Sequence, residues 1–189
     1  MTKQARTLSE RELQKLLEFV SKTKSQKRNR AIILLTHLAG MRIGEVAALR
    51  VADVLASDGT VRNEIKLSAE QTKGNNSRVV LLSARMQGEL AMYLQTVRVR
   101  DTKQHLFSTQ RSAGFTANSL TQVVNAMYKK AGFDGCSSHS GRRGFITNLA
   151  DKGVSTHVMM KLAGHKNMST TQRYIDFRPS VLRNAIELI

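Results

Sequence analysis

One stretch of the sequence constrains the fold most, because it holds the only convincing β-strand pattern in the chain. Residues 64–67 and 78–82 are short runs rich in strand-favouring residues, and Gly74-Asn75-Asn76 between them is typical of a turn. Two or three short strands joined in this way form an antiparallel sheet. The rest of the chain is patterned as helices. The sequence therefore predicts one mostly α domain, residues 1–189, with a small antiparallel β-sheet insertion (α+β).

Glycines and polar caps separate the predicted helices. Ser9 and Glu12 have the spacing of a capping box, and the apolar residues after them repeat at helical intervals. Ser169 and Gln172 suggest a second capping box. Helices are predicted at about 9–20, 31–39 (ending at Gly40), 43–49, 85–97, 116–131, 139–152, 155–163, 169–175 and 180–188.

The charge balance points to a polyanionic partner. Thirty Lys and Arg residues face fourteen Asp and Glu residues, which leaves a formal charge of +16. Nucleic acid is favoured, because neutralising phosphates releases counterions. A membrane surface is disfavoured, because the basic residues are spread along the chain rather than gathered on one amphipathic helix. No apolar run approaches the ~20 residues that a membrane span needs.

Other absences narrow the function class further. Cys136 is the only cysteine, so an intrachain disulfide is excluded and a reducing cytoplasm fits. It is interpreted as a small, partly buried residue. The N-terminus has no hydrophobic secretory core. No cluster of Asp, Glu and His has the spacing of metal ligands, so neither a metal nor another cofactor is expected.

Two segments near the C-terminus carry candidate chemistry. His139 and Arg142 are three residues apart at a predicted helix start capped by serine, where free N–H groups and the helix dipole favour an anion. The alternative is a helix whose basic residues only face solvent. Further on, His165 follows the glycine that ends a helix, and Tyr174 comes nine residues later. Tyrosines are usually packing residues, but this one follows a predicted turn close to a histidine.

Three other residues fit ordinary packing roles. His37 lies within an apolar helix and is interpreted as a core histidine with a satisfied hydrogen bond. Tyr93 and Tyr128 lie in the middle of predicted helices and are interpreted as packing tyrosines.

Taken together, these segments and two upstream ones resemble the tyrosine recombinase (phage integrase) family. The motifs are Gly40-Met41-Arg42-Ile43-Gly44-Glu45, Thr72-Lys73-Gly74, His139-x-x-Arg142, and Leu162-x-Gly164-His165 followed by Tyr174. They occur in family order, with roughly family spacing, over nearly the whole chain. Thr171, three residues before the tyrosine, also suits the pattern.

The resemblance implies a catalytic role for six residues. Tyr174 would attack a DNA phosphate and form a 3′-phosphotyrosyl bond, with Arg42 and Arg142 neutralising the phosphate. Lys73, on the hairpin tip, is the candidate acid for the leaving oxygen. His139 and His165 would bind the phosphate or move the tyrosine proton. Glu45 would brace the site, or else form an ordinary surface ion pair.

The resemblance also implies partners. Double-stranded DNA would be the substrate, and four protomers would assemble on two DNA sites, with a monomer as the alternative in the absence of DNA. The amphipathic end of the chain, 179–189, would dock on a neighbouring subunit or pack on its own domain. A bacterial or phage-derived protein acting in the cytoplasm is expected.

The chain departs from the family pattern in three places. Gly141 replaces a larger apolar residue and is expected to loosen the start of its helix. Ile175-Asp176 replaces the common Thr-His. The N-terminal clamp domain of most relatives is expected to be absent, as in the short fimbrial-switch invertases, or else removed from an excised fragment. Met1 slightly favours a complete small protein.

Two other functions compete with site-specific recombination. One is DNA relaxation of the type IB topoisomerase kind, in which religation rejoins the original strand instead of a partner duplex. The other is an inactive or regulatory DNA-binding module, which is disfavoured because every catalytic side chain is present.

Overall fold

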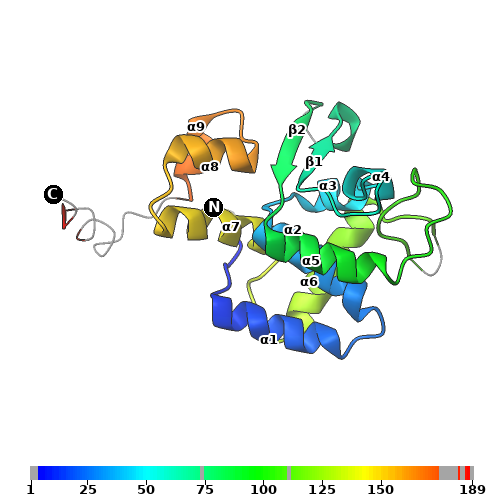
Figure 1. Cartoon of the computed structure of the whole chain (residues 1–189). Helices are drawn as coiled ribbons and strands as arrows, with labels where there is room; N and C mark the ends of the chain where they lie inside the picture. The colour runs from blue at the N-terminus through cyan, green and yellow to red at the C-terminus, as the bar shows by residue number, and fades with distance from the viewer. Residues whose placement is uncertain (1–3, 73–74, 110–111, 175–182, 184–185, 188–189) are drawn as a thin grey trace.

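The computed structural model describes residues 4–72, 75–109, 112–174, 183, 186 and 187. Within them the chain is mostly helical, with one two-stranded antiparallel sheet, as the sequence predicts (Figure 1). The elements are α1 Glu10–Ser21, α2 Gln26–Leu38, α3 Ile43–Ala48, α4 Val51–Val54, β1 Glu64–Leu67, the 3-10 helix Ala69–Gln71, β2 Arg78–Leu81, α5 Ala84–Leu94, α6 Ala117–Lys130, α7 Ser140–Asp151, α8 Thr156–Ala163 and α9 Met168–Gln172. None of the described helices combines the length and apolarity that crossing a bilayer requires.

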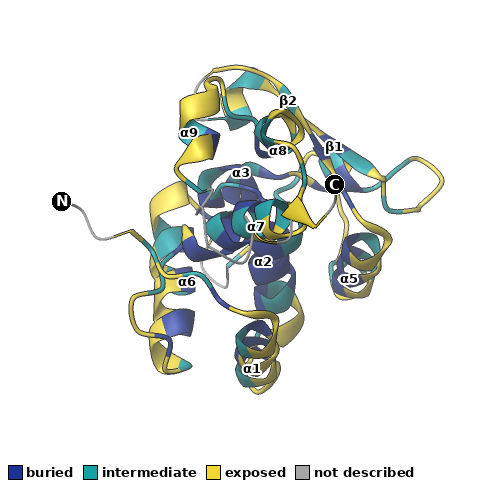
Figure 2. Cartoon of the chain, turned by 90° about the vertical axis from the view of Figure 1, so that its left-hand side faces the viewer, coloured by how far each residue is buried: buried dark blue, intermediate teal, exposed yellow. Residues whose placement is uncertain are grey.

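Helix α2 is the centre of the main hydrophobic core. Its residues 31–35 are fully buried, and α1, α5 and α7 pack around it (Figure 2). Burying a Leu or Ile side chain contributes about 1.5–3 kcal/mol, so these residues anchor α2 in the core. The helix ends where Gly40 takes a left-handed conformation, with φ +61°. That turn directs the chain into α3 and fixes the position of Arg42.

Glycines allow α2 and α7 to approach closely. A Cβ added at Gly141 would collide with the side chain of Thr36, and one added at Gly40 would collide with the ring of Phe145. Gly141 therefore has a packing role that its effect on helix propensity does not predict. The contact places the end of α2 beside the first turn of α7.

The sheet presents one face to the core. Val80 and Leu82 are buried, whereas Val79 and Leu81 are exposed, as expected when successive strand residues point to opposite sides. In the antiparallel register, Leu67 pairs with Arg78. By the same alternation, Arg78 lies on the buried face.

A second, smaller hydrophobic cluster joins α7, α8 and the segment that follows α9. Ile146, Met159 and Ala163 form its buried centre, and Phe145 and Tyr174 are among the residues that pack against it. In Figure 1, α8 and α9 lie to one side of the main helices, with α7 between the two groups. Tyr174 is thus part of a cluster distinct from the main core.

Most predicted helices occur within a residue or two of their expected bounds, and the capping box of Ser9 and Glu12 is present. The helix predicted at 85–97 ends earlier, at Leu94, because the hydroxyl and the N–H of Thr96 both bond to the Tyr93 carbonyl. The single-turn helix α4 was not predicted, because one turn is too short to show a hydrophobic period.

Two predicted caps are wrong. Helix α9 begins at Met168 after Asn167, so Ser169 lies inside the helix and the Ser169–Gln172 capping box does not form. His139, not a serine, is the cap residue of α7. The helix predicted at 180–188 lies largely outside the described residues, as does the amphipathic tail.

Candidate active site

One cavity of about 910 Å³ is lined by five of the six residues that the sequence singled out. They come from the start of α3, the start of α7, and the segments that follow α8 and α9. These residues are Arg42, His139, Arg142, His165 and Tyr174. Lys73 lies outside the described residues.

Glu45 organises the N-terminal side of the cavity. Its side chain is only 1% exposed, so it is not the surface ion pair that the sequence left open. Its carboxylate accepts hydrogen bonds from the backbone N–H of Arg42 at 2.8 Å and from Nη1 of Arg42 at 2.9 Å. Nε and Nη2 of Arg78 bind the same carboxylate at 3.1 and 2.7 Å. Burial raises the pKa of Glu45, but the bonds and charges of Arg78 and then Arg42 outweigh it and lower the pKa.

Arg142 is buried and held by backbone carbonyls. Its Nη1 donates to the Gly40 carbonyl and its Nη2 to the Ala163 carbonyl, each at 2.6 Å. Burial, followed by the charges of Arg42 and Arg78, lowers its pKa to about 9, so it stays charged at neutral pH. A guanidinium has five N–H donors, so three are left for a ligand.

His165 is held by the helix that follows it. Its Nδ1 is hydrogen-bonded at 2.9 Å to the hydroxyl of Thr171, which is fully buried in α9. Burial, followed by the charges of Arg142, Arg42 and Arg78, lowers the pKa of His165 to about 4. The imidazole is therefore neutral at pH 7, and Nε2 is the ring nitrogen left for a ligand.

Tyr174 lies between a histidine and an arginine. Its ring is nearly parallel to that of His165, with centroids 5.9 Å apart. The guanidinium carbon of Arg143 lies 5.7 Å from the centre of the Tyr174 ring, within the range of a cation–π contact. The tyrosine is half-buried and lines the cavity.

His139 is more open than the other four residues. It is exposed, at the cap position of α7, and its backbone N–H donates to the Ser137 hydroxyl at 3.3 Å. Its position three residues before Arg142 brings both to the same cavity, as the sequence predicts.

Sequence reasoning missed Arg78 and the role of Arg143. Arg78 had a signal in the sequence, because it alternates with Val80 and Leu82 on what must be the inward face of a strand. A charged side chain in such a position requires a buried partner, and here the partner is Glu45. The contact of Arg143 with Tyr174 joins α7 to the segment that follows α9, and it has no comparable local signal.

The residues interpreted as packing residues are found in such roles. His37 is buried and its Nε2 bonds to the hydroxyl of Tyr128 at 2.8 Å. The Tyr93 hydroxyl donates to the Leu106 carbonyl at 2.9 Å. Cys136 is partly buried, and burial raises the pKa of its thiol. Among the residues that the structure describes, no three or more His, Cys, Asp or Glu side chains are grouped to bind a metal.

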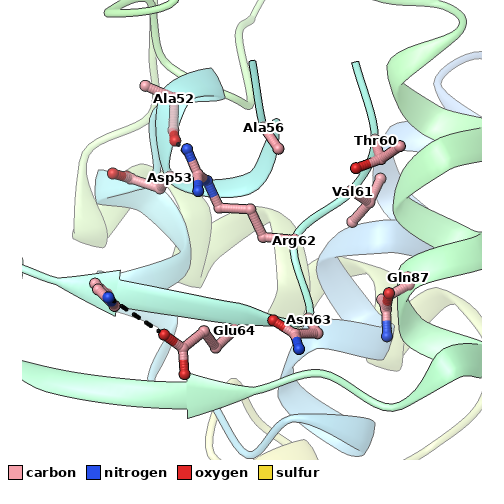
Figure 3. Close-up of a pocket in the computed structure, with 10 residues that line it drawn as sticks. Ala52, Asp53, Ala56, Thr60, Val61, Arg62, Asn63, Glu64 and Gln87 are labelled. Carbon is pink, nitrogen blue, oxygen red and sulfur yellow. Dashed lines mark hydrogen bonds and ion pairs between the residues drawn. The ribbon is translucent and has the colours of Figure 1, made fainter. Parts of the chain in front are cut away.

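A separate hollow of about 610 Å³ lies between α4, β1 and the preceding loop (Figure 3). Arg62 extends across it towards the Ala52 carbonyl, 3.4 Å from Nε, and Glu64 pairs with Lys66 at 3.4 Å. The hollow is lined by none of the predicted catalytic residues, and its charged groups include both signs.

Curated proteins with similar sequences are tyrosine recombinases. The chain is 27% identical to tyrosine recombinase XerA of Pyrococcus furiosus over 185 residues, which are 96% of this chain and 61% of the relative. It is 28% identical to tyrosine recombinase XerD of Rickettsia conorii, over 95% of this chain and 62% of the relative. The chain thus spans about three fifths of the length of these relatives.

Solved structures of the same kind share the fold. The crystal structure of XerA recombinase matches with a TM-score of 0.77 and 26% identity, over 96% of this chain and 64% of the other. XerH recombinase in a post-cleavage complex with palindromic difH substrate matches with a TM-score of 0.73 and 26% identity, over 95% and 51%. The catalytic domain of bacteriophage HP1 integrase matches in fold, with a TM-score of 0.68 and 20% identity, over 97% and 95%. The model of the Phage integrase family matches residues 6–180, and this chain therefore belongs to the Phage integrase family.

Proposed function

We propose that this chain is the catalytic domain of a site-specific DNA recombinase that cleaves and rejoins DNA through a 3′-phosphotyrosyl intermediate. The observation that carries the proposal is the shared cavity, where the phenol of Tyr174 faces the same space as Arg42, Arg142 and two imidazoles. Guanidinium groups around the cavity favour a bound phosphate and stabilise the charge that develops on it during attack.

In the proposed reaction, the Tyr174 oxygen attacks the phosphorus of a DNA phosphodiester. The bond from phosphorus to the 5′ oxygen breaks, and a 3′-phosphotyrosyl bond replaces it. The leaving oxygen takes a proton, for which Lys73 is the proposed donor, and departs as a 5′-hydroxyl. Because one phosphodiester replaces another, a second 5′-hydroxyl reverses the step without ATP.

The two histidines receive different proposed roles. His165 is neutral, and phosphate oxygens can only accept hydrogen bonds, so its Nε2–H is proposed as a donor to a non-bridging oxygen. The Thr171 hydroxyl then donates to Nδ1 and fixes this tautomer. His139, which is exposed at the cavity edge, is proposed to bind the phosphate or to receive the tyrosine proton.

Double-stranded DNA is the proposed partner. The formal charge of +16 and the basic cavity support it, and the XerH relative is solved as a complex with its DNA substrate. We propose a homotetramer on paired DNA sites, acting in the cytoplasm of a bacterium. Binding dominated by phosphate contacts predicts that DNA affinity falls steeply with salt.

Covalent capture tests the function. The chain is incubated with a pool of nicked DNA duplexes that carry a randomised segment, and protein–DNA adducts are isolated under denaturing conditions and sequenced. We expect an adduct with the native protein and none with Tyr174→Phe. Joining of the captured strand to a second, labelled duplex would distinguish recombination from DNA relaxation.

Tyr93→Phe is the matched control, because it removes a buried tyrosine hydroxyl away from the cavity. It should form the adduct at the native rate. An adduct that persists in Tyr174→Phe would refute the assignment of the nucleophile, and failure of the native protein to capture any duplex would refute the proposed activity.

A further inference from the structure

We infer that Arg78 is a positioning residue of the active site: it binds both carboxylate oxygens of Glu45 and holds the C-terminal end of α8, so that Arg42 gives Glu45 only one guanidinium N–H and stays oriented to bind phosphate. This inference rests on the proposed function. Arg78 itself is not expected to touch DNA, because its side chain is only 10% exposed, against 34% for Arg42.

The first observation is at the end of α8. Three consecutive carbonyls accept N–H groups from three different arginines: Leu162 from Arg78 at 3.3 Å, Ala163 from Arg142 at 2.6 Å, and Gly164 from Arg42 at 3.3 Å. The last carbonyls of a helix have no partner within the helix and form the negative end of its dipole. The arginines therefore cap α8 and fix the start of the segment that carries His165.

The second observation is how the hydrogen bonds of the Glu45 carboxylate are shared between Arg78 and Arg42. Arg78 binds both carboxylate oxygens through Nε and Nη2. Arg42 gives the carboxylate only one guanidinium N–H, from Nη1, and binds it also through its backbone N–H. Since the Arg78 fork binds both oxygens of the buried carboxylate, the Arg42 guanidinium gives it a single N–H and keeps its other N–H groups.

Removing Arg78 would change the hydrogen bonds that Arg42 makes to Glu45. A buried carboxylate that loses one of its two guanidinium partners is costly to leave unpaired. Arg42 is the remaining guanidinium partner of Glu45, so it would turn further towards the carboxylate, to bind both oxygens, and away from the cavity. The Leu162 carbonyl would lose its Arg78 donor at the same time.

The third observation is that the backbone makes room for Arg78. Gly164 has φ +62°, and a Cβ added there would lie 2.6 Å from Cδ of Arg78. Glycine is therefore needed at the end of α8 for two reasons: it adopts the left-handed turn, and it leaves space for the Arg78 side chain. Arg78 links β2 on the main core to α8 in the smaller cluster.

Arg30 provides a matched control. It also binds a carboxylate through Nε and Nη2, each bond 2.6 Å long, and its partner Glu89 is nearly buried. This pair joins α2 to α5 and lines no part of the active-site cavity. Arg78→Ala and Arg30→Ala therefore both remove a bidentate ion pair, but only the first lies at the proposed site.

The test compares these variants in the full chain by two measurements. Hydrogen–deuterium exchange reports local opening without DNA, and we expect Arg78→Ala to speed exchange in residues 161–166 about tenfold relative to α1, with no such change in Arg30→Ala. The rate of adduct formation on the captured DNA should fall on the order of 10²-fold in Arg78→Ala, while the dissociation constant for DNA, measured with Tyr174→Phe added, changes less than threefold.

Two further variants keep the inference testable if Arg78→Ala does not fold. Arg78→Lys should recover little of the rate, because an ammonium cannot bind two carboxylate oxygens and a carbonyl in the same geometry. Glu45→Gln added to Arg78→Ala should recover part of it, because the neutral amide no longer attracts Arg42.

The possible outcomes distinguish failure of the proposed function from failure of the positioning role of Arg78. If the native chain captures no DNA, the proposed function fails, and the exchange data alone decide the positioning role. If exchange in residues 161–166 is the same in Arg78→Ala, Arg78→Lys and Arg30→Ala, the positioning role is overturned. Equal losses of adduct rate in Arg78→Ala and Arg30→Ala would overturn it as well.

Discussion

The rings of Tyr174 and His165 lie nearly parallel, at an interplanar angle of 20°, with their centroids 5.9 Å apart. This stack, with Arg143 also near the tyrosine ring, fixes the phenol beside the arginines of its own chain. The nucleophile proposed here therefore lines the cavity formed by its own chain.

Replacing Arg143 should make the position of the Tyr174 ring less restricted. We expect Arg143→Ala to slow adduct formation about tenfold, because a cation–π contact worth about 0.5–1 kcal/mol and a neighbouring cation are both lost. Arg143→Lys keeps a cation and should retain most of the rate. Single-turnover kinetics on captured DNA would measure both, and equal rates in Arg143→Ala and the native protein would show that the contact is unimportant.

The hydroxyl of Thr171 should set the tautomer of His165. Thr171→Val keeps the shape of the side chain but removes the bond to Nδ1, so we expect a lower adduct rate and an altered pair of imidazole ¹⁵N shifts for His165. Thr171→Ser keeps a hydroxyl and is the control. Unchanged ¹⁵N shifts in Thr171→Val would contradict the assignment.

A methyl group at position 141 should destabilise the fold. Gly141→Ala would force its Cβ against Thr36, and overpacking of this kind costs about 1–3 kcal/mol in the free energy of unfolding. Gly88→Ala is the control, because Gly88 is exposed in α5 with nothing near its Cβ position, and alanine there should stabilise by about 0.5–1 kcal/mol. Urea unfolding would measure both, and a stabilised Gly141→Ala would contradict the packing role.

Burial of His37 should make stability depend on pH. Burial lowers its pKa from 6.5 to about 4, so between these values the unfolded chain binds more protons and stability falls as pH falls. From pH 7 to 5 this residue should cost about 2 kcal/mol of unfolding free energy. His37→Gln should flatten the dependence by that amount, whereas His157→Gln, at an exposed histidine, should not. Parallel pH curves for the native protein and His37→Gln would disprove the effect.

Local signals in the sequence predict the helices and the hairpin, whereas the set of residues expected at the site comes from the family resemblance. The Ser9 capping box succeeds because its partners are three residues apart. The same spacing fails at Ser169, because Asn167 offers an earlier helix start and local pattern does not choose between them. Spacing also cannot reveal that Arg142 binds the carbonyl of Gly40, since that bond joins residues 102 positions apart. The role of Arg78 is only partly predictable: its alternation with Val80 predicts that its side chain is buried, but not which carboxylate it binds.

Glu45 binds Arg42 and Arg78, and Arg142 lies on the same cavity, so these three guanidiniums and one carboxylate hold two positive charges in excess while His165 is neutral. A phosphodiester in its ordinary state brings one negative charge, whereas the five-coordinate phosphorus species of the proposed reaction brings two. Apart from the proposed donor Lys73, the charge of these four groups equals in magnitude that of the five-coordinate species and exceeds that of the diester. In the proposed reaction, Glu45 would thus reduce the excess charge of the guanidiniums to a value that favours the transient form over the DNA from which it arises.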